Sequence, residues 1–137
     1  MVRSTNYYDT FIEVAEDCPA MAGEAPPAKT GAPSVAGLQY ALIAGEPYVH
    51  TSDDVLFDVH AARQRITPAA RAAERGRFFS GSQPCLRSSP LAKRYGWGIH
   101  SNGDGKVALV PVESPEYRRL AGDPHVRHVK AMRSKRA

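Results

Sequence analysis

The sequence predicts a single domain of the α+β class, in which a small antiparallel sheet that includes a Trp97–Val112 hairpin packs against three or four short helices. The first observation is the length of 137 residues, near the commonest size of one domain and sufficient to bury a core. The second is the composition, since 42% of the residues are hydrophobic and 23% are charged, as in folded chains. The third is the pair of turn signals Asn102–Gly103 and Asp104–Gly105 between two alternating segments, which is typical of a hairpin.

The first half of the chain predicts one strand and two helices. A β-branched and aromatic run predicts a strand over residues 10–14. Residues 19–36 are rich in Pro, Gly and Ala and show no hydrophobic period, so we expect a long loop that wraps the surface. Apolar residues at helical spacing then predict helices over 34–44 and 52–65, the second capped by Ser52.

Three further helices are predicted from one recurring signal, a capping side chain followed by proline at the first helical position. The signal occurs at Thr67–Pro68, Ser89–Pro90 and Ser114–Pro115. Residues 125–137 carry many basic side chains and no recognisable element, so we interpret them as a basic C-terminal tail.

Composition and cysteine usage favour a cytoplasmic protein. No apolar run approaches the roughly 18 residues that a membrane-spanning helix requires, so no membrane partner is expected. Asp9 and Glu13 precede any apolar segment near the N-terminus, which does not resemble a secretory signal. Cys18 and Cys85 belong to no C-x-x-C pair and are expected to be free thiols. The oligomeric state stays open.

Charge is distributed very unevenly along the chain. Residues 1–60 contain two basic and nine acidic residues, a net charge of −7, whereas residues 61–137 contain sixteen basic and five acidic residues, a net charge of +11. Such asymmetry indicates either an anion-binding surface on the second half or two halves that attract one another. Mutual attraction is the simpler interpretation.

The densest group of candidate binding residues surrounds the predicted helix start at Pro90. Free backbone N–H groups and the positive end of a helix dipole attract anions. The candidate binding residues are Arg87, Ser88, Ser89, Lys93, Arg94 and His100. In the alternative interpretation the serines only cap the helix, and the basic residues are solvated or pair with acidic residues such as Glu13, Asp53 or Asp54.

These observations favour a small cytosolic module that binds an anion or a phosphate-bearing ligand. Nucleic acid is one such partner, because the basic tail (125–137) has the composition of a nucleic-acid-contacting arm. Tyr95 and Trp97 are aromatic residues of the kind that stack on bases, although packing beside the hairpin explains them as well.

The alternative function is a small enzyme with a site around Cys85, Arg87 and His100. Arg87 and the following helix start favour a thiolate at Cys85, and His100 is the candidate base. No spacing in the sequence brings Cys85 and His100 together, and a buried, inert Cys85 is the simpler interpretation. Whether the protein is an enzyme stays open.

Metal and nucleotide motifs are not recognised. The segment HTSDDVLFDVH supplies metal-ligand types at His50, Asp53, Asp54, Asp58 and His60, but His60 is expected on a different helix face from the aspartates. The glycines of SNGDGK lack the spacing of a phosphate loop and predict a hairpin turn instead. We therefore expect no metal and no cofactor.

Segments along nearly the whole chain resemble a family of short, uncharacterised microbial proteins classed only as a domain of unknown function. The segments that carry the resemblance are TNYYDTFIEVAEDCP, QYALIAGEPYVHTSDDVLF, FFSGSQPCLRSSPLAKRYGWGIH, GKVALVPVESPEYRRL and MRSKRA. The resemblance implies a free-standing domain, and it implies no activity, cofactor or catalytic residue.

Overall fold

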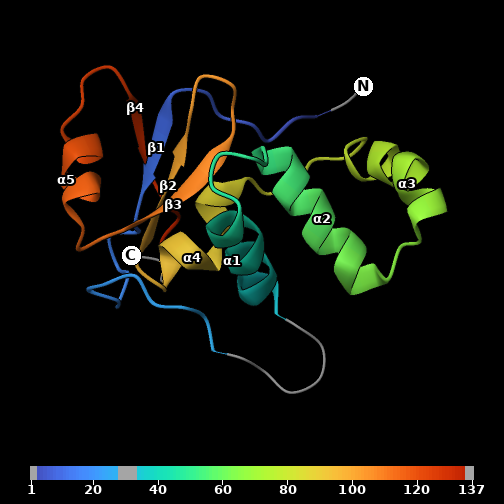
Figure 1. The fold of residues 1–137 in the computed structure, drawn as a ribbon, viewed down its shortest axis with the longest axis horizontal. Coiled ribbons are helices and arrows are strands. Elements are labelled where there is room, and N and C mark those ends of the chain that lie inside the picture. The colour runs from blue at the N-terminus through green and yellow to red at the C-terminus, as the bar shows by residue number, and fades with distance from the viewer. Residues whose placement is uncertain (1–2, 28–33, 135–137) are drawn as a thin grey trace.

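The computed structural model describes residues 3–27 and 34–134, which form a four-stranded sheet with helices on both faces (Figure 1). The strands are β1 (Thr10–Glu13), β2 (Trp97–Ser101), β3 (Val107–Pro111) and β4 (Arg127–Lys130). They lie in the order β3-β2-β1-β4. The predicted α+β class is therefore confirmed.

The predicted hairpin is present as β2 and β3. The two strands pair antiparallel from Trp97 opposite Pro111 to Ser101 opposite Val107. The turn between them is held by the side chain of Asn102, whose Oδ1 accepts hydrogen bonds from the backbone N–H groups of Asp104 and Lys106. Strand β1 joins the other side of β2, also antiparallel.

Strand β4 lies in the segment that the sequence suggested to be a basic tail, and it makes the sheet mixed rather than purely antiparallel. It pairs parallel with β1, from Thr10 opposite Arg127 to Glu13 opposite Lys130. Three of its four residues are exposed, so it shows no alternating hydrophobic pattern. Pairing with the distant β1 creates this strand, which local sequence cannot reveal.

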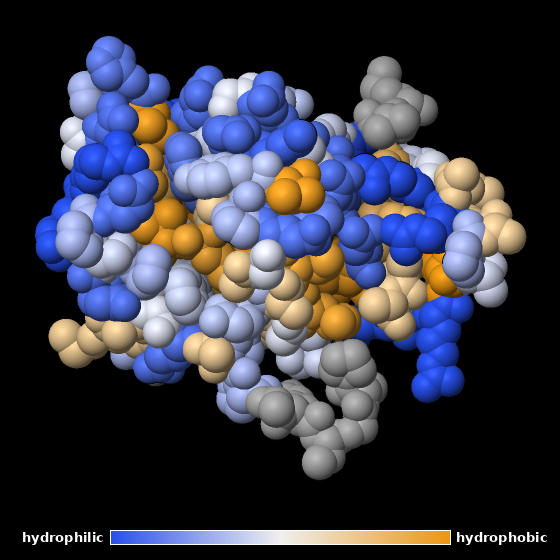
Figure 2. Space-filling view, in the orientation of Figure 1, coloured by the Kyte–Doolittle hydropathy of each residue, from blue (hydrophilic) through white to orange (hydrophobic). Residues whose placement is uncertain are grey.

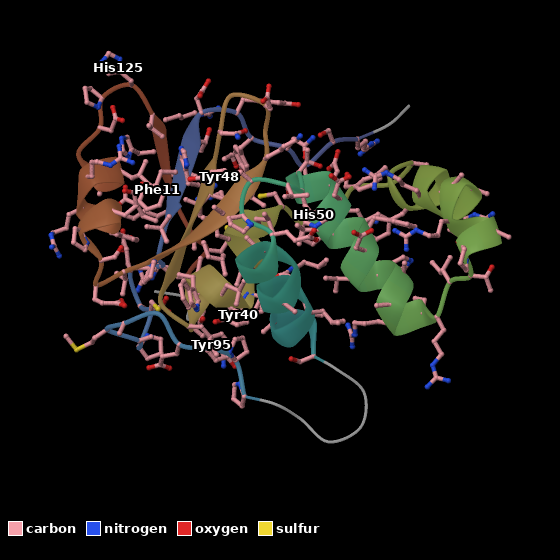
Figure 3. The ribbon with its side chains drawn as sticks, viewed as in Figure 1. Phe11, Tyr40, Tyr48, His50, Tyr95 and His125 are labelled. Atoms are coloured by element: carbon pink, nitrogen blue, oxygen red, sulfur yellow. The ribbon has the colours of Figure 1, made fainter. Side chains whose placement is uncertain are left out.

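The two faces of the sheet carry different cores because successive strand residues point to opposite faces. On one face, Ile12 and Ile99 are fully buried in a cluster with residues of the helices before β2. On the other face, Phe11 packs edge-on against Tyr117 of α5 (Pro115–Ala121), with ring centroids 4.9 Å apart. Figure 3 shows Phe11 between the sheet and α5.

Three of the four α-helices on the first face begin at a capping side chain, whereas the predicted cap Thr67 makes no capping hydrogen bond. The four helices are α1 (Val35–Gly45), α2 (Ser52–Gln64), α3 (Arg71–Phe78) with the 3-10 turn η1 (Pro68–Ala70) before it, and α4 (Pro90–Lys93) with the 3-10 turn η2 (Leu86–Ser88) before it. Ser34 caps α1 by accepting from the backbone of Gly37. The cap of α2 is Thr51 rather than the predicted Ser52, because Thr51 and Asp54 exchange hydrogen bonds in a capping box.

Helix α3 docks on α2 through charged and aromatic contacts. Arg71 pairs with Asp58 at 2.5 Å, and Arg75 pairs with Asp54 at 3.0 Å. Both guanidinium groups also lie over the ring of Phe57, at 5.1 and 5.7 Å from its centroid. These contacts join acidic residues of the first half to basic residues of the second, as the mutual-attraction interpretation predicts.

The described part of the long loop, residues 19–27, is fastened to the start of β2. Nε1 of Trp97 donates to the carbonyl oxygen of Glu24, and the backbone N–H of Glu24 donates to the carbonyl oxygen of Tyr95. Gly96 passes so close to the loop that a Cβ atom there would lie 2.3 Å from the carbonyl oxygen of Ala22. Residues 28–33 of the predicted loop lie outside the described residues.

Candidate functional site

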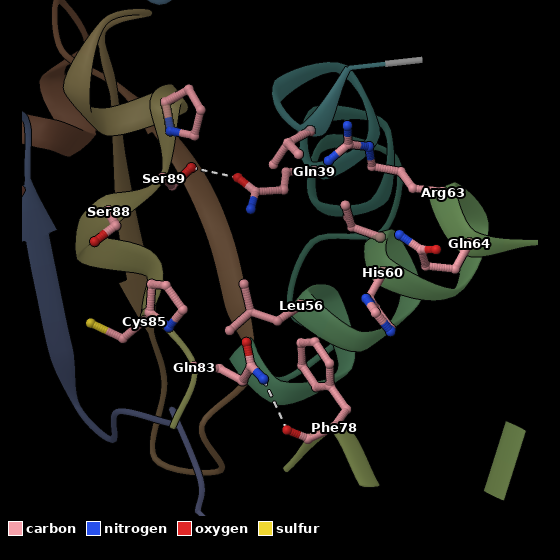
Figure 4. A pocket seen from close by; sticks show the side chains of 14 residues that line it. Gln39, Leu56, His60, Arg63, Gln64, Phe78, Gln83, Cys85, Ser88 and Ser89 are labelled. Atoms are coloured by element: carbon pink, nitrogen blue, oxygen red, sulfur yellow. Dashed lines mark hydrogen bonds between the residues drawn. The ribbon is translucent and has the colours of Figure 1, made fainter. Parts of the chain in front are cut away.

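A pocket of about 420 Å3 lies between α1, α2 and residues 83–90 (Figure 4), and we call it the α1–α2 pocket. Its volume falls in the lower part of the range of roughly 300–1,000 Å3 that is typical of small-molecule sites. The residues lining it are Val35, Gln39, Leu56, Val59, His60, Arg63, Gln64, Phe78, Gln83, Pro84, Cys85, Ser88, Ser89 and Pro90. On the face shown in Figure 2, hydrophobic side chains gather where α1 meets α2.

Helical periodicity places the lining residues of α2. Leu56, Val59, His60 and Arg63 follow one another at spacings of three, one and three, so they share one side of the helix. Leu56 and Val59 form part of the apolar wall of the pocket. His60 and Arg63 add polar groups nearer the C-terminal end of the helix. One helix therefore supplies both apolar and charged surface to the pocket.

Gln39 is the buried polar residue of the site. It lies on α1 in a buried stripe with Ala36 and Ile43, and only 3% of its surface is exposed. Its Oε1 accepts a hydrogen bond of 2.5 Å from the hydroxyl of Ser89, which also caps α4 by accepting from the backbone of Leu91. The contact links α1 to the start of α4 across the inner end of the pocket.

Gln83 is fixed at the opposite end of the pocket. Its Nε2 donates a hydrogen bond of 2.9 Å to the carbonyl oxygen of Phe78. The Phe78 ring lies 4.6 Å from the His60 ring at an angle of 35°, so the His60 side chain is held against an aromatic surface. Figure 4 shows Leu56 between the Gln39 end and the Gln83 end.

Arg63 is the one permanent charge among the described residues that line the pocket, and none of those residues is a carboxylate. Within residues 3–27 and 34–134, Arg63 belongs to none of the ion pairs. Its side chain reaches from α2 toward Gln39 (Figure 4). The lining residues therefore carry a formal charge of one positive unit, with His60 taken as neutral.

The structure brings together only some of the residues proposed from the sequence around Pro90. Ser88 and Ser89 line the α1–α2 pocket. Arg87 instead donates from Nε to the carbonyl oxygen of Lys130 in β4, and Arg94 borders an adjoining hollow of about 290 Å3, which shares Val35 and Pro90 with the pocket. Lys93 is half-buried at the end of α4, which is only four residues long. The predicted group of cations does not converge at the helix start.

Cys85 and His100, the candidate catalytic pair, lie on opposite sides of the sheet. Cys85 borders the α1–α2 pocket, but its Sγ turns away from it (Figure 4) and lies 3.4 Å from the hydroxyl of Tyr7. His100 points to the α5 face, where the hydroxyl of Tyr48 lies 2.8 Å from its Nδ1. The structure therefore does not bring this nucleophile and this base together.

Burial shifts the pKa of Tyr7, which contacts Cys85, and the pKa of His100. Burial and the nearby Cys85 raise the pKa of Tyr7, so its hydroxyl stays protonated near neutral pH. Burial lowers the pKa of His100 below its usual value, which favours the neutral imidazole. Both groups are thus neutral under ordinary conditions.

The metal-ligand types of residues 50–60 have other contacts. His50 pairs with Glu46, and Asp53 accepts hydrogen bonds from Ser4 and from the backbone and hydroxyl of Thr5. Asp54 and Asp58 pair with the arginines of α3, as described above. In the part of the chain that the structure describes, no three His, Cys, Asp or Glu residues gather in a way that would hold a metal ion.

Sequence reasoning missed most of the polar residues of the pocket: Gln39, His60 as a pocket residue, Arg63, Gln64 and Gln83. A signal was available for Gln39, because a polar residue inside the helical stripe 36-39-43 must be buried with a partner. For Gln83 no local signal exists, since its role depends on the position of α2.

The fold and the pocket define a small α+β domain with one face of helices arranged around a candidate binding site. The chain belongs to a family of unknown function, DUF6157, whose model matches residues 2–137, so the resemblance found in the sequence is confirmed. Neither curated proteins nor solved structures gave a match. Among the described residues, no helix has the length and apolar character needed to cross a membrane.

Proposed function

We propose that this protein is an anion-binding module whose ligand lies in the α1–α2 pocket. The observation that carries the proposal is Arg63, a cation without a carboxylate partner among the described residues, at a pocket with apolar walls. Arg63 itself is exposed, and a ligand that fills the pocket would shield its ion pair with Arg63 from water, which strengthens the pair. The pocket, rather than the helix start at Pro90, is thus the proposed site.

The uneven charge of the chain supports a broad nucleic-acid surface less than it does in the sequence alone, because part of the charge is paired in the structure. Besides the two pairs between α2 and α3, Lys130 approaches Glu16 at 3.8 Å. Acidic residues of the first half thereby neutralise part of the basic excess of the second half. The enzyme alternative around Cys85 loses its base, because His100 lies across the sheet.

Isothermal titration calorimetry with 4-methylpentanoate and with inorganic phosphate tests the proposal on the wild type and two variants. Arg63→Gln removes the pocket cation, and Arg94→Gln is the matched control, since Arg94 is also an exposed arginine that lines a different hollow. We expect Arg63→Gln to weaken 4-methylpentanoate binding about tenfold, because a hydrogen bond to a charged group contributes about 1.5–3 kcal/mol. Arg94→Gln should leave the affinity unchanged.

Other results contradict the proposal in distinguishable ways. Loss of affinity only in Arg94→Gln would assign the anion to the hollow that Arg94 borders, and equal loss in both variants would show that Arg63 has no special role. A single-stranded oligonucleotide that binds wild type and Arg63→Gln alike, with a steep dependence on salt, would assign the function to a basic nucleic-acid surface. Absence of binding by every probe would remove the anion-binding proposal altogether.

A further inference from the structure

We infer that the ligand of the α1–α2 pocket is a small carboxylic acid that carries a secondary amide, as an N-acylated amino acid does. The inference rests on the proposed function and names its ligand class. It follows from three polar groups of the pocket: a donor and an acceptor whose orientation hydrogen bonds fix, and one cation.

The donor is Nε2 of Gln39. The hydroxyl of Ser89 accepts a hydrogen bond from the backbone of Leu91, so its own proton is directed to Oε1 of Gln39, 2.5 Å away. With Oε1 occupied, the amide nitrogen of this nearly fully buried side chain turns into the pocket (Figure 4). No buried side-chain donor among the described residues lacks a partner, so Nε2 is reached by solvent, and a ligand with an acceptor at the α1 end would replace water there.

The acceptor is Oε1 of Gln83. The carbonyl oxygen of Phe78 can only accept a hydrogen bond, so the atom of Gln83 that lies 2.9 Å from it must be Nε2. The orientation of the amide is thereby settled, and Oε1 turns into the pocket at the end opposite Gln39 (Figure 4). A ligand must offer an N–H or O–H group at this end.

A secondary amide satisfies both ends at once. Its C=O and its N–H point in opposite directions in the trans form, one an acceptor and the other a donor. An ionised carboxylate has only acceptors and cannot donate to Gln83. Leu56, between the two ends, together with Val59 and Phe78 provides apolar wall for a hydrocarbon side chain.

The single cation selects the charge of the ligand. Arg63 neutralises one negative charge, and the described lining holds no second permanent cation. A phosphate monoester carries close to two negative charges at neutral pH, and an unpaired charge beside apolar walls is unfavourable. A carboxylate carries one charge and matches the planar guanidinium with two parallel hydrogen bonds.

Calorimetry with four probes tests this inference: N-acetyl-L-leucine, 4-methylpentanoate without the amide, N-acetyl-L-leucinamide without the charge, and inorganic phosphate. For the wild type we expect N-acetyl-L-leucine to bind at least tenfold more tightly than each of the other three. Gln83→Leu should reduce its advantage over 4-methylpentanoate to twofold or less, because the acceptor for the amide N–H is lost. Arg94→Gln serves as the control variant and should keep the full ratio.

The comparison of probes on the wild type alone keeps the inference testable if Gln83→Leu does not fold. Equal binding of N-acetyl-L-leucine and 4-methylpentanoate, both weakened by Arg63→Gln, would overturn the amide inference and leave the anion-binding proposal intact. Tighter binding of phosphate than of N-acetyl-L-leucine would overturn the choice of a carboxylate. If no probe binds, both the inference and the proposed function fail.

Discussion

Nε1 of Trp97 donates a hydrogen bond of 2.8 Å to the carbonyl oxygen of Glu24, which joins the first residue of β2 to a loop residue 73 positions earlier. The ring of Trp97 also lies 5.6 Å from that of Tyr40 on α1. One side chain thus holds a loop, a strand and a helix in their relative positions.

Replacing Trp97 separates the contribution of the ring from that of the hydrogen bond. We expect Trp97→Ala to lower the free energy of unfolding by about 3 kcal/mol, as large aromatic truncations do. Trp97→Phe keeps an aromatic ring and should cost only about 1 kcal/mol, the worth of one hydrogen bond. Urea unfolding measures both values. Met21→Ala, at an 88% exposed position of the same loop, is the control and should change little. Equal costs for the two Trp97 variants would show that ring packing contributes nothing.

Position 96 requires glycine for two reasons: the backbone conformation there and the close approach of the loop. Its φ is +79°, a region that L side chains rarely adopt, and a Cβ atom would lie 2.3 Å from the carbonyl oxygen of Ala22. Gly96→Ala should therefore destabilise the protein by more than about 2 kcal/mol, because the left-handed backbone alone costs roughly 1–2 kcal/mol. Gly81→Ala, where nothing lies within 4 Å of the added atom, should stay within about 0.5 kcal/mol of wild type in the same urea measurement.

Asp54 makes stability depend on pH in the acidic range. Burial alone would raise the pKa of this carboxyl, but hydrogen bonds from Thr51 and the nearby Arg75 outweigh burial and hold the pKa below the usual 3.8. A lowered pKa in the folded state adds stability that is complete above pH 3.8 and is lost as the pH falls through the folded pKa. Wild type should therefore be more stable than Asp54→Asn at neutral pH, and the gap should narrow toward pH 2.

The measurement for Asp54 is the urea midpoint of both proteins at several pH values. Asp104→Asn, at an exposed hairpin position, provides the control and should differ from wild type by a constant amount. A gap between wild type and Asp54→Asn that does not change with pH would contradict the role of the carboxylate charge in the capping box and in the pairing with Arg75.

His100 should produce a second pH dependence, nearer neutrality. Burial lowers its pKa in the folded state below the usual 6.5, so the unfolded chain binds the proton more tightly between these two pKa values. Its contribution to stability is then complete above pH 6.5 and is lost as the pH falls toward the folded pKa. His100→Gln should flatten this part of the curve of unfolding free energy against pH, whereas His125→Gln, at an exposed position, should leave it as in wild type. Direct titration of His100 by NMR must give a value below 6.5, or the burial argument is wrong.

The elements that sequence reasoning predicted correctly are those with local signals. The hairpin follows from Asn102 and the glycines around it, and α1 follows from its apolar spacing, to which the structure adds a cap at Ser34. Strand β4 escaped prediction because its residues are mostly exposed and its one partner, β1, lies more than a hundred positions away. Tertiary pairing, not propensity, determines that strand.

The candidate site was harder to predict than the fold, since pockets form between distant elements. The separation of Cys85 from His100 was nevertheless contained in the pattern of β2: Ile99 belongs to the helix-covered core, so His100 must face the other way. The convergence of Gln39 and Gln83 on one pocket depends on how α1, α2 and residues 83–90 pack, and no local pattern encodes that packing.

The position of β1 in the sheet has a consequence for how the protein is made. β1 precedes the other strands of the sheet in the chain, yet its partners β2 and β4 begin at Trp97 and Arg127. During synthesis β1 therefore stays unpaired until β2 has been made, and the sheet is complete only after β4 has been made. Such high contact order slows folding, and the exposed strand at residues 10–13 is the segment that a nascent-chain chaperone would need to shield.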